Sequence, residues 1–303
     1  MKIVIAGATG FIGKALCENL VEHHHVVALT RDRQKAAFIL PKEIEILNWD
    51  AVSSDKQKEK FSGCDAIINL TGVSIAQGRW TKKQRAEILN SRINSTKILI
   101  EYAKSSDPKP EVMMLASAIG FYGNGGDKRL NEDSSAGDGF LSGVCQQIEG
   151  LAKEIRAAGI RDVVIRTSIV LDARGGALGK MILPFKFFLG SKFGNGQQWM
   201  SWISLADEIA AIRFVIDNQN LNGVFNLSSP VPVRNGDFVK TLASALHRRC
   251  FIALPEKMLK VLFGPKAEEL FLLSQKVYPD RLLDAGFKFK YPDLKSAFES
   301  MNF

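Results

Sequence analysis

Residues 1–13, MKIVIAGATGFIG, decide the fold class of this chain. The apolar run at residues 3–6 predicts a buried strand, and residues 14–21 carry apolar side chains at helical spacing. A glycine-rich turn separates the two. Strand, turn and helix in this order predict a unit that binds a mononucleotide half of a larger cofactor.

Three glycines at spacing three form the turn, and each has a separate task. Gly7 permits the tight turn, Gly10 lets a pyrophosphate approach the backbone, and Gly13 lets the helix pack closely on the strand. The start of the helix then faces the phosphates. We therefore expect a dinucleotide at this turn, contacted also by the residues between and just after the glycines, namely Thr9, Phe11 and Ile12.

Strand and helix patterns alternate through the first half of the chain. We expect strands at residues 26–29, 44–47, 66–70, 112–116 and 163–166, and helices at 55–61, 82–104 and 140–158. Continuous apolar strands that alternate with helices indicate a parallel sheet covered on both faces. The predicted fold class is α/β, a Rossmann doubly wound sheet whose ligands bind at the carboxyl ends of the strands.

The second half is less regular. It suggests a loop at residues 175–179, a strand at 223–227, and helices at 180–189, 204–217, 238–246 and 256–278. We expect residues 1–170 to form the cofactor-binding domain, with segments at about 204–228 returning to it. Residues 171–303 would form a smaller, partly helical C-terminal domain that holds the substrate.

Composition narrows the class of protein. The chain has 303 residues, 46% of them hydrophobic, and a net charge of +8 without a dense run of Lys and Arg. Without such a run we do not expect the protein to bind nucleic acid. The first strand leaves no room for a signal peptide and no stretch could span a bilayer, so we expect a cytoplasmic protein that does not bind a membrane. The residues 23–25 are all His, but consecutive side chains diverge, so we expect a surface turn and no metal.

The end of the second predicted strand indicates which dinucleotide binds. An NAD site usually places an acidic residue there to take the ribose hydroxyl groups. This chain has Thr30 followed by Arg31, and a guanidinium suits a 2′-phosphate. We therefore favour NADP as the cofactor. Asp32 comes one or two places late, so NAD stays open as the less favoured alternative.

Longer motifs resemble a known family. The glycine turn, Leu70-Thr71-Gly72 and residues 121–123 (FYG) are similar to the extended short-chain dehydrogenase/reductases. Further matches lie at GRWT (78–81), SR (91–92), PF (184–185), WMSWI (199–203) and LLDAGFKFKYPD (282–293). Together they resemble the atypical, epimerase-like branch of that superfamily, which carries a C-terminal domain of unknown function.

The resemblance implies a Rossmann domain that binds NADP. By position it implies cofactor contacts at Thr30 and Arg31, and also at Leu70, Thr71, Gly72, Glu87, Arg92 and Val170. Ser204 departs from the family, which usually has His in that segment.

The acid–base pair of the superfamily is missing from its expected place. Most members use a Tyr and, four residues later, a Lys that lowers the Tyr pKa. The window 138–149 contains neither residue: Leu141 stands where Tyr would be, and Cys145 where Lys would be. The Ser that orients the substrate would fall on Ala118, with Ser117 one place early. The pair therefore needs a substitute if the protein is an enzyme.

Three substitutes are candidates, each beside a structural interpretation. Ser117 could contact the substrate, or it could be a hydrogen-bonding serine at the end of a strand. Tyr122 could act as an acid, or it could be a packing residue in the loop. Cys145 could be a catalytic thiol, or it could be a small buried residue. Glu149 is expected to be a helix-surface or capping acid. Candidates to line a substrate pocket are Trp80, Trp199, Met200 and Trp202.

The leading hypothesis is an NADP-dependent oxidoreductase or sugar-nucleotide-type epimerase, with an unknown small molecule as substrate. The alternative is a non-catalytic NADP sensor.

Overall fold

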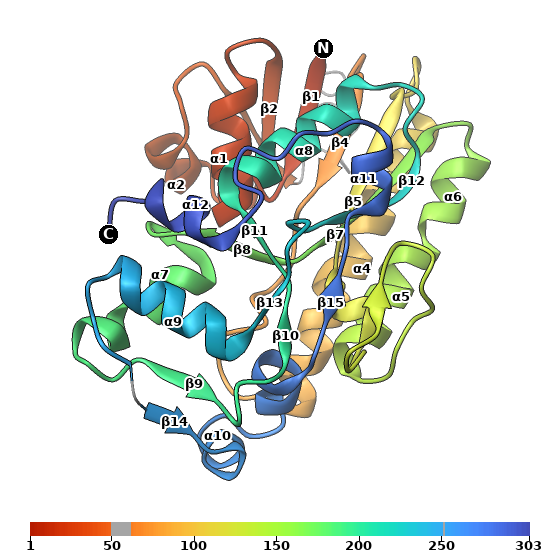
Figure 1. Cartoon of the computed structure of the whole chain (residues 1–303). Coiled ribbons are helices and arrows are strands. Elements are labelled where there is room, and N and C mark those ends of the chain that lie inside the picture. Colours follow the sequence, from red (N-terminus) through yellow and green to blue (C-terminus); the bar gives the residue numbers. More distant parts are fainter. Residues whose placement is uncertain (50–61, 251) are drawn as a thin grey trace.

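A sheet of seven strands, each parallel to its neighbours, forms the centre of the computed structural model, which describes residues 1–49, 62–250 and 252–303 (Figure 1). The strand order is β12-β7-β5-β4-β1-β2-β3. In chain order the strands are β1 (Lys2–Ala6), β2 (His25–Thr30), β3 (Glu45–Asn48), β4 (Ala66–Asn69), β5 (Val112–Ala118), β7 (Arg161–Thr167) and β12 (Gly223–Leu227). The order reverses between β1 and β4, and the glycine turn lies at this reversal, where ligands of such sheets bind.

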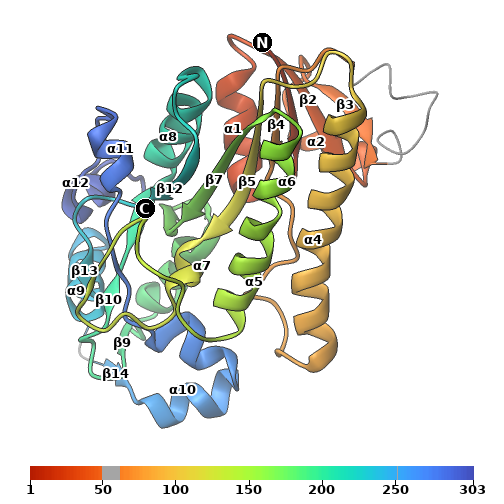
Figure 2. The same ribbon diagram turned by 90° about the vertical axis from the view of Figure 1, so that its right-hand side faces the viewer.

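Helices cover both faces of the sheet (Figure 2). One face carries α1 (Phe11–Leu20) and α8 (Leu205–Asp217), and the other carries α4 (Lys82–Ser105), α5 (Phe140–Gly150) and α6 (Ala152–Ala157). Because both faces are covered, the strands are almost continuously apolar. No helix among the described residues has the length and apolar character needed to cross a membrane.

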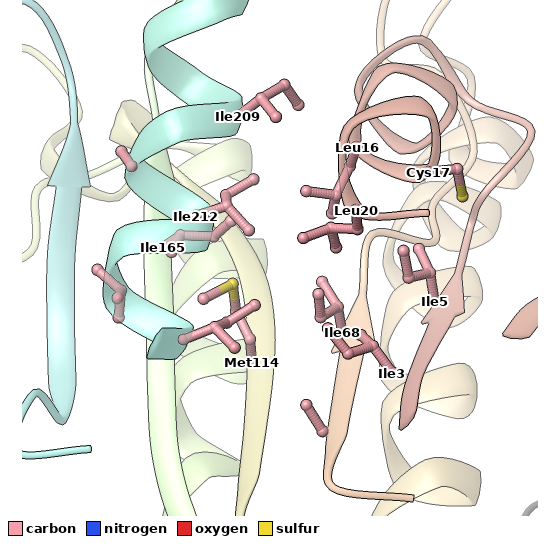
Figure 3. Packing of buried hydrophobic residues seen from close by; sticks show 14 of the residues in the cluster. Ile3, Ile5, Leu16, Cys17, Leu20, Ile68, Met114, Ile165, Ile209 and Ile212 are labelled. Carbon is pink, nitrogen blue, oxygen red and sulfur yellow. The ribbon is translucent and has the colours of Figure 1, made fainter. Parts of the chain in front are cut away.

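Apolar side chains fix α1 and α8 against the sheet. Figure 3 shows Leu16 and Leu20 of α1 and Ile209 and Ile212 of α8 above the strands. Below them lie the buried strand residues Ile3, Ile5, Ile68, Met114 and Ile165. Burying each such side chain contributes about 1.5–3 kcal/mol to folding. This cluster holds the glycine turn and the carboxyl ends of the strands in fixed positions.

The remaining elements lie beyond the carboxyl ends of the strands or return beside the sheet (Figure 1). A separate hydrophobic cluster, centred on the fully buried Trp202, Phe238 and Phe298, holds most of them together. The helices and longer strands are α2 (Arg33–Ile39), β8 (Ile169–Asp172), α7 (Gly176–Lys186), β9 (Ser191–Phe193), β11 (Trp202–Ser204), α9 (Asn235–Ala245), β14 (Ile252–Leu254), α10 (Glu256–Phe263), α11 (Asp280–Asp284) and α12 (Leu294–Glu299). Shorter pieces are β6 (Arg129–Leu130), β10 (Trp199–Met200), β13 (Val233–Arg234), β15 (Lys276–Val277), a 3₁₀ turn (Ile119–Tyr122) and a π-helical turn (Glu268–Leu272).

The predicted Rossmann fold is confirmed, and the differences concern individual helices. The helix expected at 140–158 is two helices that meet at Leu151, and the loop expected at 175–179 already contains the start of α7. The helix expected at 256–278 is wrong beyond Phe263, because Gly264 has a φ of +62° and Pro265 follows it. The helix expected at 55–61 lies outside the described residues.

Candidate cofactor and substrate site

The glycine turn has no room for side chains. Gly7 has a φ of +87°, and a Cβ atom there would lie 2.8 Å from the carbonyl carbon of Leu70. A Cβ on Gly13 would lie only 2.2 Å from the carbonyl oxygen of Gly7. That oxygen accepts the amide of Gly10 at 2.9 Å, which closes the turn. The turn therefore depends on glycine at both positions, and it brings Leu70 beside Gly7.

The start of α1 is an open anion site. The helix begins at Phe11, its cap residue is Gly10, and no side chain of residues 1–49, 62–250 or 252–303 accepts a hydrogen bond from its first amides. No acidic side chain lies in its first turn. Because the first amides of a helix lack partners within the helix and carry partial positive charge, they attract a phosphate group. Thr9 and Ile12 flank this position half-buried.

The end of β2 presents a cation to the same edge of the sheet. The amide of Asp32 donates to Thr30 Oγ1 at 3.1 Å, and the Asp32 carboxylate accepts the amide of Lys35 at 3.0 Å as the cap of α2. Arg31 is exposed, and it has no ion-pair partner among the described residues. The carboxylate that could select a ribose hydroxyl is thus engaged in capping, whereas the guanidinium can meet an anion.

The loop after β4 is tied to α4 by hydroxyl groups. Thr71 Oγ1 lies 2.6 Å from Asn69 Oδ1 and 2.5 Å from Ser95 Oγ, and Asn69 Nδ2 donates to Thr96 Oγ1 at 2.9 Å. The amide of Leu70 donates to the Ala6 carbonyl at 2.8 Å. These bonds fix Leu70 and Thr71 opposite the glycine turn.

Arg92, on α4, also contacts the loop after β4. Its Nη1 donates to the carbonyl oxygens of Val73 at 3.0 Å and Ile88 at 2.9 Å. The guanidinium lies over Gly72, where a Cβ atom would stand 2.5 Å from Arg92 Cζ. Burial lowers the pKa of Arg92, and no carboxylate pairs with it among the described residues. Glu87, expected as a cofactor contact, is exposed five residues earlier on α4 and forms no ion pair with Arg92 among the described residues.

Residues from the second half of the chain cover the glycine turn. Val170 of β8 is buried and pairs in register with Ile203 of β11. The following turn packs on Phe11: a Cβ on Gly175 would lie 3.0 Å from the Phe11 ring, and one on Gly176 would lie 2.8 Å from it. Val170 and Phe11 thus belong to one hydrophobic cluster beside the glycine turn.

Glu149, expected to be a helix-surface or capping acid, instead lies at the centre of a buried polar network. Ser117 Oγ donates to Glu149 Oε1 at 2.7 Å. Arg166 donates to both carboxylate oxygens, from Nε at 3.0 Å and from Nη2 at 2.8 Å. The helix α5 turns Glu149 toward β5 and β7, where the Arg166 guanidinium compensates its charge. The hydroxyl of Ser117 is therefore committed to Glu149.

Tyr122 belongs to the same network. Its hydroxyl donates to Asn226 Oδ1 at 2.7 Å and accepts from Arg166 Nη1 at 2.8 Å. The side chain is 3% exposed, and burial raises the pKa of Tyr122 to about 12. Both hydrogen-bonding positions of the phenol are occupied, which leaves it poorly placed to exchange a proton with a bound molecule.

Cys145 is buried behind the end of β5. Its Sγ lies 3.6 Å from the carbonyl oxygen of Ala118, and burial raises the pKa of the Cys145 thiol. One turn earlier, the Leu141 side chain packs against Gly120. Leu141 and Cys145, at the positions expected for the Tyr and Lys, thus form an apolar wall beside Gly120, and burial favours the thiol of Cys145 over the reactive thiolate.

A pocket with a volume of about 50 Å³ lies between the strand ends and the C-terminal region. Ile119, after β5, and Ile169, after β7, form one side. The other side is lined by Phe193, Trp199, Met200, Ser201, Glu269, Leu270, Phe271, Leu273 and Gln275. Two of the four expected pocket residues are thus present. Trp202 is fully buried in the core, and Trp80 packs edge-on against Phe140 with 5.2 Å between ring centroids.

Two residues of the C-terminal region contact the site, and no pattern in the sequence predicts these contacts. Glu269 accepts the amides of Phe140 at 3.0 Å and Leu141 at 2.8 Å, at the start of α5. Lys266 donates to the carbonyl oxygens of Gly78 at 2.7 Å and Ala76 at 3.3 Å. Only the folded chain brings these partners together.

Comparisons with known proteins agree with this geometry. Residues 3–140 match the NAD dependent epimerase/dehydratase family, and residues 254–301 match a domain of unknown function, DUF1731. An epimerase family protein of Mycobacterium leprae is 36% identical over 295 residues, which cover 97% of this chain and 94% of the relative.

Solved structures extend the match. The structure of human epimerase family protein SDR39U1 with NADPH has a TM-score of 0.87 at 30% identity and covers 99% of both chains. A nucleoside-diphosphate sugar epimerase of Corynebacterium glutamicum has a TM-score of 0.76 at 31% identity, covering 98% of this chain and 57% of that one. The chain belongs to the epimerase family of atypical short-chain dehydrogenase/reductases, in the branch that carries the DUF1731 domain at its C-terminus.

Proposed function

We propose that this protein binds NADPH at the glycine turn and uses it on a small molecule held in the pocket below the C-terminal region. The observation that carries the proposal is that the uncapped start of α1 and the exposed Arg31, which has no ion-pair partner in the described part of the chain, lie at neighbouring strand ends. The first attracts the pyrophosphate, and the second suits the 2′-phosphate that distinguishes NADP from NAD.

The residues present fit the cofactor. A Cβ at Gly7 or Gly13 would enter the space that the turn needs, and the loop Leu70–Gly72 lies opposite. Arg92 adds a half-buried cation beside Gly72. When bound, NADPH supplies a hydride for reduction, and the relative SDR39U1, whose structure contains NADPH, has the same fold over its whole length.

The reaction class that we propose is an oxidoreductase or a sugar-nucleotide-type epimerase that works without the usual Tyr and Lys. The apolar wall of Leu141 and the buried Cys145 support this departure. Among the residues that line the pocket, Glu269 is the single titratable side chain. Its carboxylate accepts the amides of Phe140 and Leu141, so proton transfer would fall to water rather than to Glu269 or Tyr122.

One observation favours the alternative, an NADP sensor that does no chemistry. All three sequence candidates for catalysis are engaged or buried: Ser117 by Glu149, Tyr122 by Asn226, and Cys145 below Ala118. A sensor needs the cofactor site but no proton donor at the pocket. The two functions therefore share cofactor binding and differ in turnover.

Titration of the purified protein with NADPH and NADH, followed by nicotinamide fluorescence, tests the proposal. We expect tighter binding of NADPH, and equal or stronger binding of NADH would overturn the cofactor assignment. Incubation of the NADPH complex with a panel of aldehydes, ketones and nucleotide sugars separates the two functions. NADPH oxidation or sugar interconversion supports the enzyme, whereas binding without turnover across the panel supports the sensor.

A further inference from the structure

The C-terminal region contacts three separate parts of the Rossmann sheet edge through one short segment, residues 266–275. Lys266 reaches the loop between β4 and α4, Glu269 reaches the start of α5, and the Gln275 side-chain amide donates to Ile119 at 2.9 Å and Gly123 at 3.0 Å. For these three side chains, the acceptors and donors on the Rossmann side are all backbone groups. The segment therefore fixes the course of the main chain around the site.

Lys266 is buried, which is rare for a lysine without a carboxylate partner. It is 8% exposed, and its ammonium group donates to two backbone carbonyls, those of Ala76 and Gly78. The Phe263 ring lies 5.8 Å from its Nζ atom. A buried charge is stable only where hydrogen bonds replace its hydration, so this contact specifies one position of the loop.

Glu269 supplies the cap that α5 lacks. The helix begins after Gly139, which has a φ of +108° and no side chain to accept the first amides. The Glu269 carboxylate accepts two of them, from Phe140 and Leu141. A carboxylate at a helix start is also favoured by the helix dipole. The end of α5 that carries Leu141 is thus held by a residue from 128 positions further along the chain.

The two contact points also touch each other. Trp80, in the loop that Lys266 holds, packs edge-on against Phe140, in the helix start that Glu269 holds. The Arg85 guanidinium lies 5.7 Å from the Trp80 ring centroid and 5.2 Å from that of Phe140. Loop, helix and C-terminal segment therefore form one closed junction at the carboxyl ends of β4 and β5, and the loop begins at Leu70, beside Gly7 of the glycine turn.

We propose that Lys266 and Glu269 are positioning residues, and that the C-terminal domain of unknown function clamps this junction over the bound cofactor. The clamp would slow NADPH release and set the shape of the pocket that Glu269, Leu270 and Phe271 line. This inference rests on the proposed cofactor function. The experiment that tests it gives one result if the clamp is wrong and a different result if the protein does not bind NADPH.

The experiment compares six forms of the full chain: the natural protein, Lys266→Met, Lys266→Arg, Glu269→Gln, and two controls in the C-terminal region. The controls are Lys260→Met and Glu268→Gln, which change an exposed ion pair with a distance of 3.8 Å. Stopped-flow fluorescence measures NADPH dissociation after mixing with excess NADP⁺. Hydrogen exchange of the unliganded proteins follows the amides of residues 76–81 and 139–142.

We expect Lys266→Met and Glu269→Gln to release NADPH about tenfold faster, because each loses a charge-assisted hydrogen bond. The controls should stay within about twofold of the natural rate. Lys266→Arg, which keeps donors for both carbonyls, should restore slow release. Exchange should increase at residues 76–81 in Lys266→Met and at residues 139–142 in Glu269→Gln.

Unchanged release rates with unchanged exchange would overturn the clamp. A lower melting temperature with a natural release rate would also overturn it, because it would show a merely structural role. If the natural protein binds no NADPH, the cofactor proposal fails. The exchange experiment on the unliganded proteins then still shows whether the segment holds the junction.

Discussion

Glu149 and Arg166 form a two-point salt bridge in the interior of the Rossmann domain. Arg166 Nε lies 3.0 Å from Glu149 Oε1, and Arg166 Nη2 lies 2.8 Å from Glu149 Oε2. Arg166 is 4% exposed and Glu149 11% exposed. Since Ser117 and Tyr122 bind to the same pair, the bridge organises the polar groups behind the candidate site.

Removing one partner of this bridge should cost much stability. Arg166→Met removes both guanidinium bonds to the Glu149 carboxylate and the donor to the Tyr122 hydroxyl, so we expect the free energy of unfolding to fall by about 3–5 kcal/mol. Urea unfolding measures the change. The control is Lys295→Met, which breaks the exposed pair with Glu299 and should change stability by less than about 0.5 kcal/mol. A loss below about 1 kcal/mol in Arg166→Met would contradict a buried, structurally required bridge.

Arg31→Ala should separate the two nicotinamide cofactors. The guanidinium is expected to pair with the 2′-phosphate, so its loss should weaken NADPH binding by about 10–100-fold. NADH has no such phosphate, and its affinity should change by less than about twofold. Arg33→Ala, which removes an exposed cation two residues later, is the matched control. An equal loss of affinity for both cofactors would remove Arg31 from the 2′-phosphate site.

Gly13→Ala should disrupt the glycine turn. The new Cβ would meet the Gly7 carbonyl oxygen at 2.2 Å and the Ala8 Cα at 2.9 Å, and both are backbone atoms that cannot rotate away. We expect NADPH affinity to fall more than about tenfold and stability to fall by about 1–3 kcal/mol. Fluorescence titration and urea unfolding measure the two effects.

The matched control for this prediction is Gly143→Ala in α5, where a Cβ meets nothing within 4 Å. Alanine is the better helix former, so this variant should gain about 0.5–1 kcal/mol. If both variants bind NADPH as the natural protein does, the turn does not need glycine at position 13.

Glu208 should make the free energy of unfolding fall as the pH rises. Its side chain is fully buried on α8, Thr167 Oγ1 donates to it at 2.8 Å, and burial raises the pKa of Glu208 to about 8. Between its ordinary pKa and about 8 the unfolded chain has lost this proton while the folded chain still binds it. Stability therefore falls as the pH rises through this window and is constant above it.

Urea unfolding at pH 5, 6, 7 and 8 tests this expectation. The contribution of Glu208 has a slope of about 1.4 kcal/mol per pH unit at most. Glu208→Gln, which cannot ionise, should remove that contribution and be the more stable form at pH 8. Identical pH profiles of the natural protein and Glu208→Gln would show that the carboxyl group does not titrate in this range.

The sequence was informative where one local signal decides the structure. Gly7, Gly10 and Gly13 stand in a single turn, so their spacing alone predicts the shape of that turn. The continuous apolar strands likewise predict the parallel sheet, because each strand pattern is local. Arg31 follows the strand directly, and its exposure could be inferred from its neighbours.

Contacts between distant residues could not be predicted. Glu149 has the spacing of a helix-surface residue, and only the position of Arg166 on β7 explains why it is buried. Lys266 meets Gly78 across 188 positions of the chain, and no pattern in either segment indicates the other. The helix expected at 256–278 failed for a local reason, since the Gly264-Pro265 pair stops it.

The position of β12 at the edge of the sheet has a consequence for how the protein is made. Its residues 223–227 pair with β7, although β8, α7 and α8 are synthesised between the two strands. During translation the unpaired edge of β7 is therefore exposed until residue 227 has left the ribosome. An open edge of this kind invites pairing with other chains. We expect chains that stop before β12 to aggregate in cells, even though they contain the complete glycine turn.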